Sequence, residues 1–164
     1  MKHLEEKFGG PIHDLDTYLE ILTRFLSGLR ESGFAAFKYY ATKPRLVPDY
    51  DAARKVFMEF VDPGQPHPIV EAVILDHVFK KAAEWDWTVS VHCGGAYMDT
   101  RTYDTRYIIY TVSRYPETRF DLFHLCVPFT REIIYIAKMY ANTTLNLCWC
   151  PVLSESMTRT AINE

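Results

Sequence analysis

Two histidines, His92 and His124, are the residues of this chain best placed to do chemistry. Each closes a short apolar segment typical of a buried strand, and they lie 32 residues apart, about one strand–helix–strand step. If the two strands are parallel neighbours, both imidazoles emerge at the edge of the sheet where α/β proteins bind ligands. Two imidazoles at one edge predict the beginning of a metal site, the alternative being a hydrogen-bonded structural histidine at each strand end.

Lys38 is a second candidate, because it lies in the otherwise apolar segment 34–40. A lysine is rarely buried unless it is paired. One hypothesis places its ammonium at the strand end, in contact with substrate or metal-bound water. The other lets the side chain run along the surface and keeps the ammonium in solvent.

The four cysteines, Cys93, Cys126, Cys148 and Cys150, follow the same strand ends as the histidines. A zinc site built on them would normally show C-x-x-C spacing, which is absent. We expect small buried hydrophobic residues, with a cysteine nucleophile beside a histidine as the alternative.

The charged residues near the two histidines are expected to play lesser parts. Asp121 has the opposite strand parity to His124, so we expect it to face a helix. Four charged residues follow the His92 strand, in a region where loops often hold substrate, although a solvated loop explains each one singly. These four are Asp99, Arg101, Asp104 and Arg106.

The elements that must position these residues alternate along the chain. Strands are predicted at 34–40, 87–92, 119–124 and 143–149. Helices are predicted at about 14–30 (capped by Asp14 or Asp16), 50–60 (capped by Asp49), 69–85, 105–114, 130–140 (capped by Thr130) and from 154 onward. Strands that alternate with helices imply a parallel sheet with right-handed crossovers.

The strand spacing fits both a barrel and an open doubly wound sheet, but the lack of a phosphate loop and the side-chain parity favour the barrel. The later strands begin 31 and 24 residues apart, against about 31 residues per unit in a (β/α)8 barrel. No glycine-rich phosphate loop is present, and polar residues share one parity, Ser90 with His92 and Asn146 with Cys148. We therefore predict an α/β fold: one partial domain over residues 1–164, an incomplete (β/α)8 TIM barrel with about four parallel strands.

Composition narrows the classes of partner. The chain has 164 residues, 48% hydrophobic and 24% charged, with a net charge of −3. A basic surface for nucleic acid and an apolar run of the roughly 18 residues that a membrane span needs are both missing. The polar N-terminus is unlike a secretory signal, so we expect a cytoplasmic protein with reduced thiols.

Three sequence phrases resemble the amidohydrolase-related family of metal-dependent hydrolases and decarboxylases, within the superfamily that includes uronate isomerase. These phrases are V-H-C-G-G around His92, H-L-C-V-P around His124, and A-N-T-T-L-N-L-C-W ending at Trp149. The phrase G-F-A-A-F-K-Y-Y, residues 33–40, also resembles that family's fourth-strand region.

The resemblance implies that the four strands are strands four to seven of a barrel. His92 is then the fifth-strand metal ligand, and His124 is the sixth-strand ligand or substrate contact. Lys38 lies near the fourth-strand position that supplies a ligand in some members, so Lys38 and His124 are the implied catalytic residues. The implied cofactor is a divalent metal, zinc first and manganese or iron as alternatives, which activates water or polarises a carbonyl. The implied substrate is a small molecule, and hydrolysis, decarboxylation and uronate isomerisation all stay open.

Two departures from the family pattern limit this reading. The first-strand H-x-H motif is absent from these residues, and so is a following eighth strand that ends in aspartate. We therefore expect the piece to hold a metal weakly and to be inactive alone, and we expect its unpaired edge strands to favour association into a homo-oligomer. The alternative is a stand-alone α/β module that binds a ligand or partner without metal chemistry.

Overall fold

The computed structural model describes residues 2–8, 10–40, 47–61, 67–94 and 105–164. The chain divides into two compact units, one of Met1–Ala35 with Arg45–Lys81 and one of Ala36–Pro44 with Ala82–Glu164. We call them the helical unit and the sheet unit and describe each by itself. That residues 1–164 form one partial domain stays a prediction.

The helical unit packs around a small apolar core. Its helices are α1 (Lys2–Phe8), α2 (Leu15–Glu31), α3 (Tyr50–Val61) and most of α4 (Pro68–Glu84). The core residues that are wholly shielded from water are Leu15, Ala53, Phe57, Val70 and Val73. On α3 and α4 they recur at the four- and three-residue spacing of an amphipathic helix, the same kind of pattern from which the sequence predicts α2, α3 and α4.

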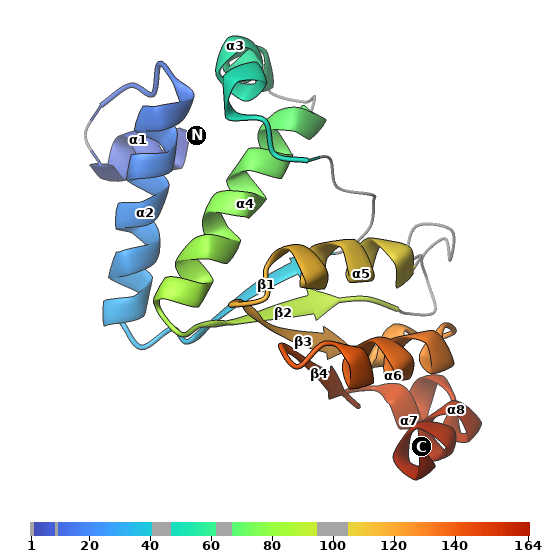
Figure 1. Ribbon diagram of the computed structural model, residues 1–164. Coiled ribbons are helices and arrows are strands. Elements are labelled where there is room, and N and C mark those ends of the chain that lie inside the picture. The colour runs from blue at the N-terminus through green and yellow to red at the C-terminus, as the bar shows by residue number, and fades with distance from the viewer. Residues whose placement is uncertain (1, 9, 41–46, 62–66, 95–104) are drawn as a thin grey trace. The chain divides into compact units, whose positions relative to one another are not determined.

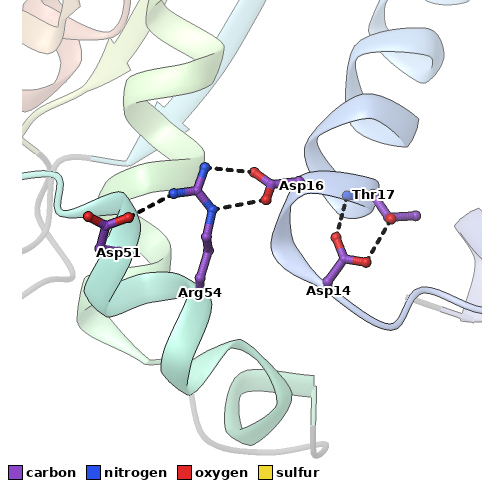
Figure 2. A network of polar contacts seen from close by, with 5 residues as sticks. All are labelled: Asp14, Asp16, Thr17, Asp51 and Arg54. Carbon is purple, nitrogen blue, oxygen red and sulfur yellow. Dashed lines mark hydrogen bonds and ion pairs between the residues drawn. The ribbon is translucent and has the colours of Figure 1, made fainter.

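Polar contacts fix the starts of α2 and α3 (Figure 2). Asp14 caps α2, because its carboxylate accepts hydrogen bonds from the backbone N–H of Thr17 at 2.8 Å and from its hydroxyl at 2.9 Å. Arg54 on α3 donates to Asp16 on α2 and to Asp51, each at 2.9 Å. These exposed ion pairs add little stability, but the Asp14 cap confirms the predicted start of α2.

The sheet unit has four parallel strands in the order β1-β2-β3-β4, with flanking helices (Figure 1). The predicted α/β fold is therefore confirmed. The strands are β1 (Ala36–Tyr40), β2 (Thr88–His92), β3 (Arg119–Phe123) and β4 (Thr143–Asn146). The helices are α5 (Thr105–Arg114), α6 (Thr130–Met139), α7 (Cys150–Leu153) and α8 (Glu155–Asn163).

The two faces of this sheet differ in polarity. Val89, Val91, Phe120 and Leu122 point to one face and are at most 2% exposed. The other face carries a row of polar residues in register across the four strands: Lys38, Ser90, Asp121 and Thr144. Successive side chains of a strand alternate between faces, so the polar parity predicted from sequence is the less buried face.

Several predicted boundaries were wrong in detail. β4 ends at Asn146 and leaves Cys148 outside the strand, while α1 and α7 were missed. Thr130 is the first residue of α6, whose N-cap is Phe129, so Thr130 does not cap the helix. The parts of the chain that the structure describes contain no helix with the length and apolar character of a membrane span.

Candidate metal centre

The site forms at the edge of the sheet where the parallel strands end. Tyr40, His92, Phe123 and Asn146 are in register there. The ring of His92 lies 4.5 Å from the ring of Tyr40, measured between centroids. This is the edge at which parallel α/β sheets place their ligand sites.

His124 lies just beyond β3, in a turn rather than in the strand. His124, Leu125 and Cys126 have φ values of 63°, 49° and 47°, a left-handed run that non-glycine residues rarely adopt. The turn places the His124 ring 4.7 Å from the His92 ring, with the two planes at 76°. The two predicted site histidines are therefore neighbours in space, and His124 is only 9% exposed.

The same turn explains why the predicted orientation of Asp121 was wrong. Asp121 pairs with Ser90 across the sheet, on the face that carries Lys38 and His92. The predicted parity assumes that β3 continues through His124. Since the chain turns at His124, alternation ends at Phe123 and Asp121 does not face a helix.

Gly94 allows the loop after β2 to touch this turn. Its φ is +107°, and a Cβ atom there would lie 2.7 Å from the backbone nitrogen of Val127. No side chain fits at that distance, so glycine is required for both its conformation and its size. The contact holds the chain after His92 against the turn that carries His124.

Lys38 reaches toward the same edge of the sheet. Its Nζ lies 3.0 Å from the centroid of the Phe123 ring, a cation–π contact. Partial removal from water lowers the pKa of Lys38, against the opposing effect of Asp121. The structure thus places the Lys38 ammonium against Phe123, which is in register with His92, and its role stays a prediction.

The electrostatic surroundings favour neutral His92. Partial burial lowers the pKa of His92, and nearby His124 and Lys38 lower it further. A histidine must be neutral to bind a metal, so the surroundings hold His92 in the form that a metal requires.

A backbone carbonyl sets the tautomer of His124. Its Nδ1 lies 2.7 Å from the carbonyl oxygen of Cys148. A carbonyl can only accept, so Nδ1–H donates and the lone pair of the neutral ring belongs to Nε2. Metal-binding histidines are commonly oriented by such a contact on the other ring nitrogen.

The cysteines do not form a thiolate site in the described residues. All four are free thiols, and Cys93, Cys126 and Cys150 are buried. Burial raises the pKa of Cys150 to about 11, and burial together with Cys93 raises the pKa of Cys126. Protonated buried thiols are poor nucleophiles, which favours a packing role for Cys126 and Cys150 over the catalytic alternative.

The pair fits a divalent metal as two of its ligands. Within the described ranges no group of three or more His, Cys, Asp or Glu residues is placed to hold a metal ion. A catalytic zinc usually has three protein ligands, so two imidazoles alone would bind it weakly. Of the predicted loop residues, Asp99, Arg101 and Asp104 lie outside the described residues, and Arg106 is on α5.

Comparisons with known proteins give a fold and no family. No family model matches the chain, and no curated protein matches it. The structure is similar to a uronate isomerase from Thermotoga maritima, with a TM-score of 0.71 and 18% identity, over 88% of this chain and 37% of that one. It is also similar to a protein from Lactobacillus casei provisionally described as a metal-dependent hydrolase, with a TM-score of 0.65 and 18% identity, over 99% of this chain and 50% of that one.

These likenesses show an α/β fold shared with part of two longer proteins. The chain spans half or less of the length of either one. At 18% identity the similarity establishes the arrangement of strands and helices alone, without the chemistry of those proteins.

Proposed function

We propose that this chain carries part of the active site of a metal-dependent hydrolase that acts on a small molecule. One observation carries the proposal: the ring centroids of His92 and His124 lie 4.7 Å apart at the strand ends, and the Cys148 carbonyl orients His124. The provisional description of the Lactobacillus casei protein points to the same class.

In this proposal His92 and His124 are two metal ligands. When bound, a divalent metal supplies a Lewis acid that activates water or polarises a substrate carbonyl or carboxylate. Zinc is the first candidate for imidazole nitrogen ligands, with manganese or iron as alternatives. The low pKa of His92 keeps its ring available as a ligand.

Lys38 is proposed to bind or orient substrate rather than to hold the metal. Its ammonium lies against the Phe123 ring, and Phe123 is next to His92 in the sheet register. A cation there would attract a negatively charged oxygen of substrate. His124, as ligand and neighbour of His92, would contact the same reacting group.

A uronate-isomerase-type reaction is the second candidate. It is favoured by the structural similarity to the Thermotoga maritima enzyme, which has the TM-score of 0.71. Both candidates use the same two histidines and the same edge of the sheet. In both, a whole enzyme requires metal ligands beyond those described here, so the piece alone is proposed to be inactive.

Zinc titration of the purified chain tests the metal proposal. We expect weak binding that falls at least tenfold in His92→Ala and in His124→Ala, measured by calorimetry. His13→Ala is the matched control, since His13 is exposed and far from the sheet in sequence. Equal zinc affinity in the wild type and both site variants would refute the proposal and favour a module without metal chemistry.

A further inference from the structure

The end of β4 carries a network of polar contacts that leads to His124. Asn146 is the last residue of β4, and Cys148, two residues later, supplies the carbonyl that accepts from His124. The side chain of Asn146 also bonds to this segment: its Oδ1 accepts from the backbone N–H of Cys148 at 2.8 Å. This is an Asx turn, which fixes the peptide groups that follow the asparagine.

Asp121 on β3 fixes the amide of Asn146. Asp121 Oδ2 accepts from Asn146 Nδ2 at 2.9 Å, and its Oδ1 accepts from the Thr144 hydroxyl at 3.2 Å. A carboxylate accepts only, so it selects the amide orientation in which Nδ2 points to Asp121 and Oδ1 is left for Cys148. The contacts then run continuously from Asp121 through Asn146 and the Cys148 backbone to His124.

From this network we infer that Asn146 and Asp121 are positioning residues for His124. They hold the Cys148 carbonyl where it keeps the proton of His124 on Nδ1 and leaves Nε2 as the ligand atom. Neither residue touches the metal or the substrate in this scheme. The ligand role of His124 rests on the proposed function. The tautomer of His124 does not, because it follows from the contact with the Cys148 carbonyl.

The tautomer can be measured without any metal. Long-range ¹H–¹⁵N spectra of the metal-free chain distinguish an Nδ1–H ring from an Nε2–H ring through the ¹⁵N shifts. We expect Nδ1–H at His124 in the wild type. In Asn146→Ala the Cys148 peptide loses its anchor, so the signals should move toward Nε2–H. Asp121→Ala should have a smaller effect in the same direction.

Two further variants separate positioning from general stability. Asn146→Ser keeps a side-chain oxygen that can accept from the Cys148 N–H, so it should restore the Nδ1–H tautomer. Thr144→Val removes one bond to Asp121 and leaves Asn146 in place, so it should keep the wild-type tautomer. An Nδ1–H ring that persists in folded Asn146→Ala would overturn the inference.

Zinc binding gives the second readout. Loss of a contact that orients a metal ligand typically weakens metal binding 10- to 100-fold, so Asn146→Ala should lose roughly that much zinc affinity, with partial recovery in Asn146→Ser. If zinc affinity is the same in wild type, His92→Ala and His124→Ala, the proposed function fails. A tautomer that still responds to Asn146 would then leave the positioning role standing.

Discussion

Asn142 offers a sharp test of how the sheet unit is held together. Its side-chain Nδ2 lies within hydrogen-bond distance of three backbone carbonyls, those of Val112, Tyr115 and Thr118, at 3.0 to 3.1 Å. These carbonyls belong to the end of α5 and to the turn that leads into β3. One side chain therefore joins the starts of β3 and β4 to the helix between β2 and β3.

The cost of removing this contact follows from its geometry. An amide nitrogen has two hydrogens, so three acceptors share about two hydrogen bonds. At about 1 kcal/mol net for each bond, Asn142→Ala should destabilise the unit by about 2 kcal/mol, or roughly 8 to 16 °C in Tm for a unit of this size. Asn142→Asp should cost more at pH 7, because a carboxylate oxygen would then face three carbonyl oxygens. That excess should shrink at low pH, where the carboxyl is protonated and can donate.

Tryptophan fluorescence can follow this unfolding selectively, because all three tryptophans, Trp85, Trp87 and Trp149, belong to the sheet unit. Urea unfolding of each variant gives its free energy. Asn163→Ala, a substitution at an exposed residue near the end of α8, is the control and should change it by less than about 0.5 kcal/mol. An alanine variant as stable as wild type, or an aspartate variant no worse than alanine at pH 7, would refute the reasoning.

Three other outcomes are expected. Gly94→Ala should lower the free energy of unfolding by about 2 kcal/mol or more, because a left-handed φ and a backbone clash combine. Gly28→Ala, in open space on α2, should raise the free energy of unfolding by about 0.5 to 1 kcal/mol. Urea unfolding that ranks the two variants the other way would contradict this. Asp76→Ala should destabilise the helical unit by about 1 to 3 kcal/mol, because this 3% exposed carboxylate accepts from a tyrosine hydroxyl and pairs with a lysine. Thermal circular dichroism measures the change, and a Tm equal to that of the wild type would count against the prediction. By NMR the His92 pKa should lie below 6.5, so the stability that neutral His92 contributes is fully present above pH 6.5 and is lost as the pH falls from 6.5 through the lowered pKa. Lys38→Met should raise the His92 pKa, and an unchanged pKa would exclude the influence of the lysine.

The sequence was informative wherever one physical rule decided the outcome. An aspartate before an apolar helical period predicted the start of α2, and Asp14 caps it. Alternating valines predicted β2, and Val89 and Val91 are buried. In these places the local preference and the tertiary packing agree, so the pattern was enough.

The same rules failed where tertiary contacts override local preference. Nothing in H-L-C marks a left-handed turn, because His124, Leu125 and Cys126 are all residues that normally avoid positive φ. The sequence pattern therefore extends β3 by one residue, to His124, and predicts the wrong face for Asp121. Gly94 was the available signal, since a glycine after a strand indicates a close backbone approach.

The polar face of the sheet supports the proposed site. The interior of a (β/α)8 barrel is normally filled by layers of branched apolar side chains. Here the middle row instead carries Lys38, Ser90, Asp121 and Thr144. Asp121 is engaged by its neighbours on β4, so its charge supports the site rather than competing for a metal. In the proposed function, the two imidazoles at the edge of this face would hold the cation, and the polar row below them would face a polar substrate in place of apolar packing.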